Sequence, residues 1–326
     1  MKSRVAILSV RPETIADDYR RLLQLAGLWP GEFPPWDLMA VAARGGSWQP
    51  GRDCPPWQVH AALQALGEGS GLLALTDKGP AAARGRWSAL LADSPVHPWS
   101  ADTLERSPYR AAQPVPSLES SLEKGLQLSP HLRERRPLLL TPVSLAEGGL
   151  LQAAVAWLAR WLAPERRRSS KIPEAEVLAE VVALAAELFP GLGIICDATV
   201  LGVRRRSGAR VTLDRNLLVA GKDPVAVDAV LARLTGSRPA SLPWLRLAQQ
   251  RQVGNSAADR IEVLGDPHLM DLDFQIPKDS FAAGKGGLLS RILPTRTDAD
   301  DSAVDRSAGD SPWQRLHDDF QTGAVS

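Results

Sequence analysis

Three aspartates between Leu188 and Gly236 are the residues best suited to chemistry. Asp197 interrupts the apolar run GIICDATVL, which predicts a buried strand with one carboxylate exposed at its tip. Asp223 and Asp228 lie in GKDPVAVDAVLARLTG, which predicts a helix that begins at Pro224 and stops at Gly236. Open α/β sheets bind ligands at strand ends, and oxygen ligands suit Mg²⁺ or a phosphate-bearing group. These aspartates are therefore candidate ligand-binding residues, and Asp197 and Asp223 are the candidate metal ligands.

Two of these aspartates also have a purely structural interpretation. Asp223 can accept hydrogen bonds from the free N–H groups of the first helical turn as a helix cap. Asp228 can be a surface charge near the positive end of the helix. Both interpretations stay open at the level of sequence.

Basic residues next to predicted strands are candidate anion ligands. Arg204 and Arg205 form a turn after the Asp197 strand, where guanidinium groups can bind a carboxylate or phosphate in bidentate fashion. Arg44 precedes a Gly-Gly pair that lets backbone approach an anion. Solvated loops are the alternative in both places. If both loops face Asp197, we expect an anion-selective pocket.

The same region carries a family resemblance. Asp197 and the segment Gly221, Asp223, Pro224, Val225, Ala226, Asp228 and Ala229 resemble the carboxy-terminal part of the domain of unknown function 362 family, in which an Asp after a strand and a G-x-D-P-V-A-x-D-A helix start recur. RIEVLGDP at 260–267 is similar to the closing strand of that family, and VAILSV at 5–10 to its opening strand. The resemblance implies an α/β fold and adds Gly221 to the candidate ligand-binding residues.

The chain departs from the family pattern at several places. Arg44-Gly45-Gly46 stands where members usually carry Lys-Pro-Asn, and 138–162 has neither a Lys-x-His nor a Lys-Asn pair. Cys54 and Cys196 are too few for the ferredoxin-type cluster of many members, so we expect no iron–sulfur cluster, and other cofactors stay unknown. These departures favour a non-catalytic binding or assembly protein. The alternative is an enzyme that acts on a small anionic substrate, with redox-linked chemistry as one of the options.

The elements that must position these residues alternate between strand and helix. This alternation predicts an α/β fold with a mostly parallel sheet flanked by helices. We expect one α/β domain over 1–268, a small helix-rich insertion at about 145–190, and an extended, partly disordered tail over 269–326, where residues 297–311 are acidic and small.

Trp157 and Trp161 lie one turn apart in an apolar helix with a basic end. This helix is a candidate partner surface or, more weakly, a peripheral membrane contact; burial inside the protein is the alternative.

Composition excludes several classes of protein. The 326 residues are 44% hydrophobic with a formal net charge of +1, which argues against a nucleic-acid binder or a disordered chain. No apolar run is long enough for a transmembrane segment, and two cysteines suggest a reduced, cytoplasmic setting. The expected partners are a small anionic ligand or a protein, and the oligomeric state stays unknown.

Overall fold

The computed structural model places a defined set of residues. The described residues are 2–29, 37–41, 51–66, 71–75, 98–100, 105–130, 136–146, 149–163, 172–205, 207–272, 274–277, 280 and 311–322. Arg44 lies outside this set.

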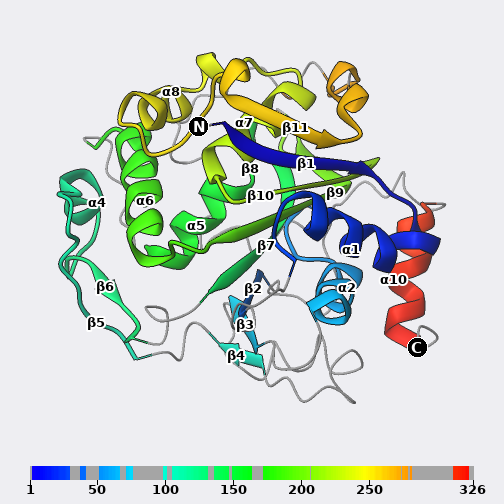
Figure 1. Cartoon of the computed structure of the whole chain (residues 1–326), viewed down its shortest axis with the longest axis horizontal. Coiled ribbons are helices and arrows are strands. Elements are labelled where there is room, and N and C mark those ends of the chain that lie inside the picture. Colours follow the sequence, from blue (N-terminus) through cyan, green and yellow to red (C-terminus); the bar gives the residue numbers. More distant parts are fainter. Residues whose placement is uncertain are drawn as a thin grey trace.

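A mixed sheet runs through the whole molecule, and its strands follow the order β11-β1-β10-β9-β7-β2-β3-β4 from top to bottom in Figure 1. The short strand β8 pairs with the end of β7. The bounds are β1 Ser3–Ser9, β2 Asp37–Val41, β3 Gly71–Leu75, β4 Pro98–Ser100, β7 Pro137–Ala146, β8 Leu150–Gln152, β9 Gly193–Arg204, β10 Arg210–Gly221 and β11 Ile261–Gly265.

The main strands of the sheet are parallel except β10. Strand β10 forms a hairpin with β9 and also runs antiparallel to β1 on its other side, whereas β1–β11, β9–β7, β7–β2, β2–β3 and β3–β4 are parallel pairs. The prediction of an α/β fold with a mostly parallel sheet is confirmed. Because β10 is reversed, its last residues lie beside the beginning of β1, where Gly221 pairs with Val5.

One face of the sheet is covered by helices from both ends of the chain. These are α1 (Ile15–Leu25), α2 (Pro56–Leu66) and α10 (Pro312–Thr322), and the 3-10 turn η1 (Pro12–Thr14) precedes α1. Helix α1 buries Ile15, Tyr19, Leu22 and Leu23, the stripe expected of an amphipathic helix. Helix α10 contacts α2 and η1.

The other face carries α5 (Ala154–Leu162), α6 (Glu174–Leu188), α7 (Pro224–Leu234) and α8 (Pro243–Gln250). The region expected as a helix-rich insertion contains α5 and α6, which form the crossover between the parallel neighbours β7 and β9. Helices α5 and α7 pack together, as do α6 and α8. Between the two helical layers, the central strands are apolar and fully buried, as at Ile7, Leu139, Ile194 and Val219.

Short elements complete the described fold. Strands β5 (Ser107–Pro108) and β6 (Gln127–Leu128) flank α4 (Pro116–Ser120) in an arm, residues 105–130, that lies against α6. In sequence order, the 3-10 turns η4 (Pro239–Ser241) and η5 (Ala258–Arg260) come before β11, and the 3-10 turn η6 (Pro267–Asp271) follows it. No helix in the described ranges is both long and apolar enough to cross a membrane.

The expected C-terminal tail contains an element that the sequence analysis missed. Residues 312–322 form α10, and its Trp313 is fully buried. Residues 281–310, which include most of the acidic stretch, lie outside the described residues.

Candidate functional site

Asp197 lies in the interior of β9, not at its tip. It pairs with Leu218 of β10 and Pro142 of β7, and the strand continues for seven more residues to Arg204. Its side chain is only 3% exposed. The prediction of a carboxylate at the strand tip is wrong, because pairing with β10 extends β9 beyond the apolar run GIICDATVL to Arg204.

Protein donors surround the Asp197 carboxylate. Oδ1 accepts the backbone N–H of Thr199 at 2.9 Å and the Thr199 hydroxyl, and Oδ2 accepts Tyr19 OH at 3.1 Å and Trp57 Nε1 at 3.2 Å. Burial raises the pKa of Asp197 to about 6, although these hydrogen bonds favour the ionised form. A carboxylate offers about four acceptor positions, and four donors fill them here. Asp197 therefore ties α1 and α2 to β9 and has no acceptor position left for a metal or substrate.

The strands around Asp197 are irregular. The β7–β9 register shifts between the pairs Pro142–Asp197 and Ser144–Gly202, and β10 shifts between Asp214 and Leu217. Asn216, in the β10 irregularity, has a left-handed φ of +53°. Such bulges re-aim side chains and are frequent beside binding sites.

Asp223 is the N-cap of α7, as one of the two sequence interpretations predicts. Its Oδ1 accepts the N–H groups of Val225 at 2.9 Å and Ala226 at 3.2 Å. Its Oδ2 accepts Ser3 Oγ at 2.6 Å and the N–H of Asn255 at 2.9 Å. One carboxylate thus joins the beginning of β1, the start of α7 and the turn before β11.

Gly221 serves close packing at the end of β10. A Cβ there would stand 3.0 Å from the carbonyl oxygen of Arg4 and 3.0 Å from Val227 Cγ2. The glycine lets β10 approach β1 and α7, so its place in the motif has a packing explanation.

Asp228 is buried, with 1% exposure, and is not a surface charge. It accepts the N–H groups of Ala154 at 2.8 Å and Val155 at 3.1 Å, which belong to the first turn of α5. Burial raises the pKa of Asp228 to about 7 against the effect of these two hydrogen bonds. Asp228 therefore caps α5, a helix that is distant from it in the sequence.

The candidate residues do not converge on one pocket. Asp197 faces α1 and α2, whereas Asp228 lies on the opposite face of the sheet near Cys196. There the charge of Asp228 adds to burial in raising the pKa of the Cys196 thiol. Asp223 lies at the edge where β1 begins, and Arg204, paired with Arg210, lies with Arg205 at the far end of the hairpin. For the described residues, the prediction of a shared pocket is wrong because the β9–β10 hairpin reverses the second strand. Nowhere in the described ranges do three His, Cys, Asp or Glu side chains gather to hold a metal ion.

Trp157 and Trp161 are buried, with exposures of 3% and 1%. The indole Nε1 of Trp157 donates to the carbonyl of Pro142 at 3.1 Å, and Arg160 lies over the same ring at 4.6 Å. The prediction of a partner surface on these two residues is therefore wrong, and the alternative of burial is confirmed.

A groove of about 670 Å³ lies elsewhere, between the last turns of α7, η4 and the edge strand β11. Its polar side chains are Arg233, Ser237, Arg238 and Ser256, and its apolar ones include Val230, Ile261, Val263 and Met270. No motif in the sequence marks this groove, because its residues come from separate segments of the chain. The one signal was two arginines on either side of a helix-ending glycine, Gly236.

Comparisons of the chain with models of protein families, with curated proteins and with solved structures found no match. Any functional argument therefore rests on the geometry of the chain itself.

Proposed function

We propose that this protein is a non-catalytic binding protein and that the groove between α7, η4 and β11 holds a small anionic ligand. The observation that carries the proposal is the chemistry of the lining: two arginines and two serines, with no carboxylate, imidazole, thiol or amine among the described lining residues. Such a set can bind an anion, but it has no general base that could activate a serine hydroxyl as a nucleophile.

The two arginines are suited to anion recognition. Arg233 and Arg238 are both exposed, and neither forms an ion pair within the part of the chain that the structure describes. A guanidinium group binds a carboxylate or phosphate through two parallel hydrogen bonds. Ser237 adds a hydroxyl donor at the same groove, whereas the hydroxyl of Ser256 donates to Gln249 Oε1 at 2.8 Å.

The apolar lining indicates the rest of the ligand. Val230, Ile261, Val263 and Met270 line the groove together with small residues. Ligand sites combine a mainly apolar wall with a few polar groups that fix orientation. We therefore expect a ligand with an apolar body and a carboxylate or phosphate group.

The aspartates of the family-like motif do not favour the enzyme alternative. Four hydrogen-bond donors occupy the acceptor positions of the Asp197 carboxylate, and Asp223 and Asp228 cap helices. If the chain is a divergent relative of the domain of unknown function 362 family, as we propose from the sequence motif, it uses these aspartates for structure. The two buried cysteines, Cys54 and Cys196, are not joined in a disulfide, which is consistent with the cytoplasmic location that we also propose.

Thermal unfolding in the presence of inorganic phosphate, phenyl phosphate and hexanoate tests the groove. A ligand at a hundred times its Kd adds about 2.7 kcal/mol to the free energy of unfolding. We expect phenyl phosphate or hexanoate to stabilise the wild-type protein, and the Arg233→Ala/Arg238→Ala variant to lose that response. The matched control is Arg246→Ala, an exposed arginine on α8 outside the groove, which should respond like the wild type.

Two results contradict the proposal. One is the absence of any response from the wild-type protein to these anions. The other is a response that survives in the double arginine variant, since that would place the ligand outside the groove.

A further inference from the structure

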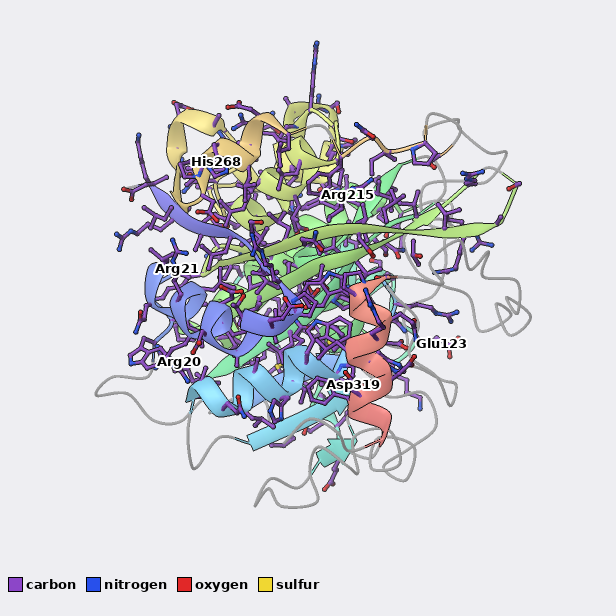
Figure 2. The ribbon with its side chains drawn as sticks, turned by 90° about the vertical axis from the view of Figure 1, so that its right-hand side faces the viewer. Arg20, Arg21, Glu123, Arg215, His268 and Asp319 are labelled. Atoms are coloured by element: carbon purple, nitrogen blue, oxygen red, sulfur yellow. The ribbon has the colours of Figure 1, made fainter. Side chains whose placement is uncertain are left out.

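Trp313 is the buried anchor of α10, the helix at the far end of the chain. Its side chain has 0% exposure, although residues 281–310 separate this helix from Ser280, the preceding described residue. Helix α10 lies beside α2 (Figure 2), and Phe320 makes an edge contact with His60 at 5.4 Å between ring centroids. A distant segment thus inserts one large aromatic side chain into the body of the protein.

Two residues hold the indole of Trp313. Its ring packs against that of Trp57 in a tilted arrangement, with 5.2 Å between the ring centroids and 36° between the planes. Its Nε1 donates to Oδ1 of Asn216 at 2.7 Å. One residue therefore recognises an aromatic face, and the other recognises an N–H in the ring.

The Trp57 ring and the Asn216 backbone are each held by contacts that do not involve α10. Trp57 donates its own Nε1 to Asp197, and Asp197 is held by Tyr19 and Thr199. Asn216 lies in the β10 irregularity with its left-handed φ, and its carbonyl accepts the N–H of Val10. Asp197 is a positioning residue here, because rotation of the Trp57 ring would break a buried hydrogen bond. The arrangement is preorganised for a ring, as in a ligand site.

We propose that Trp57 and Asn216 form a binding site for a planar aromatic group with a ring N–H donor, and that Trp313 of the same chain occupies this site. The class of ligand is an indole-like or nucleobase-like heterocycle. The Trp57 ring supplies attraction to an aromatic ring, and the side-chain oxygen Oδ1 of Asn216 selects rings that donate a hydrogen bond. Helix α10 is then an internal ligand that a free ring of this class can replace.

The first test uses the full chain with Trp313→Ala and the probe N-acetyltryptophanamide in titration calorimetry. We expect saturable binding to this variant. The matched control is Trp244→Ala, which removes a buried tryptophan of α8 with 3% exposure and should not bind the probe. Equal binding by the two variants would show that any tryptophan cavity takes the probe, and no binding by Trp313→Ala would equally overturn the proposal.

The second test probes the hydrogen bond. The 1-methylindole analogue of the probe cannot donate to Asn216 and should bind Trp313→Ala about tenfold more weakly. Adding Asn216→Gly keeps the left-handed backbone available and removes the acceptor, so it should weaken the N–H probe by about the same factor. Unchanged affinity in both experiments would overturn the proposed recognition by Asn216.

The third test needs no variant and stands even if Trp313→Ala does not fold. Hydrogen exchange of the wild-type protein is followed with millimolar N-acetyltryptophanamide. We expect faster exchange of the α10 amides, because the probe competes with Trp313, and unchanged exchange in β7 and β9. Unaffected exchange in α10 would mean that the helix is a permanent part of the core, which contradicts the proposal.

Discussion

Asp228 accepts the backbone N–H of Ala154 at 2.8 Å across 74 residues of sequence. The carboxylate is part of α7, and the amide belongs to the start of α5, so one helix caps another. Five residues earlier, Asp223 caps α7 itself. The two aspartates of the G-x-D-P-V-A-x-D-A segment thus organise two different helix starts on one face of the sheet.

Replacing this interhelical cap should destabilise the protein. We expect Asp228→Asn to lower the free energy of unfolding by about 1–3 kcal/mol at pH 8, where the carboxylate with its pKa of about 7 is ionised, because the amide can accept only one of the two N–H groups and turns its own donor toward the other. Urea unfolding measures the change. Asp271→Asn, at an exposed position, is the control and should stay within about 0.5 kcal/mol of the wild type.

The buried aspartates should also make stability depend on pH. Burial raises the pKa of Asp197 to about 6 and that of Asp228 to about 7, from an ordinary 3.8. The folded state therefore binds these protons more tightly than the unfolded state, and the free energy of unfolding should fall as pH rises from about 4 to about 7. Urea unfolding at several pH values should show a shallower fall for Asp228→Asn than for the wild type. Parallel curves would contradict this account.

The hydrogen bonds of Asp197 can be tested by a graded pair of variants. Asp197→Asn should cost about 2–4 kcal/mol, since an amide oxygen cannot serve four buried donors and the amide nitrogen faces some of them. Tyr19→Phe removes one of the four donors and should cost about 1 kcal/mol. Denaturant unfolding followed by tryptophan fluorescence gives both values. Equal losses would mean that the carboxylate is not the centre of this cluster.

Gly51 is expected to tolerate no side chain. It has a φ of +70°, and a Cβ would stand 2.6 Å from both Cα and N of Gly202, backbone atoms of β9 that cannot rotate away. Gly51→Ala should lower the free energy of unfolding by about 2–4 kcal/mol. Gly208→Ala is the matched control: its φ is +89°, but the space around it is open, so only the backbone penalty of about 1 kcal/mol applies.

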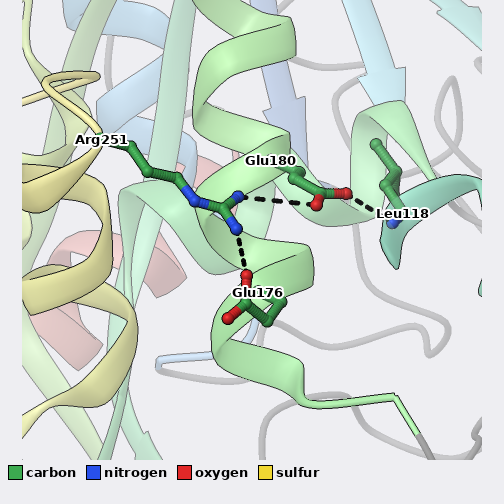
Figure 3. Close-up of polar contacts among 4 residues, drawn as sticks. All are labelled: Leu118, Glu176, Glu180 and Arg251. Atoms are coloured by element: carbon green, nitrogen blue, oxygen red, sulfur yellow. Dashed lines mark hydrogen bonds and ion pairs between the residues drawn. The ribbon is translucent and has the colours of Figure 1, made fainter. Parts of the chain in front are cut away.

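Glu180 should hold the 105–130 arm on α6. It accepts the N–H of Leu118 in α4 at 2.8 Å and lies 3.5 Å from Arg251, which also pairs with Glu176 (Figure 3). We expect Glu180→Ala to speed hydrogen exchange in the arm about tenfold, because the start of α4 loses its acceptor. Glu176→Ala removes a partner of the same arginine without touching the arm, so it should leave that exchange unchanged.

Local patterns in the sequence predicted local structure well. Asp223, Pro224 and Gly236 indicated the start and end of α7, and the structure has an Asp223 cap and a helix over Pro224–Leu234. The order strand, basic turn, strand is the β9–β10 hairpin. Caps, turns and periodicity involve neighbours in sequence, and so they can be read from it.

The arrangement of the candidate site could not be read in the same way. Alternation along β9 sends Asp197 and Cys196 to opposite faces, and the partners of each are set by helices from distant parts of the chain. The sequence around Asp228 does not indicate that its carboxylate accepts the N–H of Ala154. Likewise, the sequence around Trp313 does not indicate that its indole donates to Asn216. Burial and partnership across such distances follow from the topology, which the local pattern does not determine.

The position of β1 has a consequence for synthesis of the chain. This strand is made first, yet both of its neighbours, β10 and β11, are made in the last half, with Val5 paired to Gly221 on one side and Val263 on the other. The apolar segment around Val5–Leu8 must therefore leave the ribosome without a strand to pair with and wait for most of the polypeptide to follow. During that interval the backbone N–H and C=O groups of β1 lack the strand partners that they have in the folded protein, so non-native pairing competes until β10 has been made.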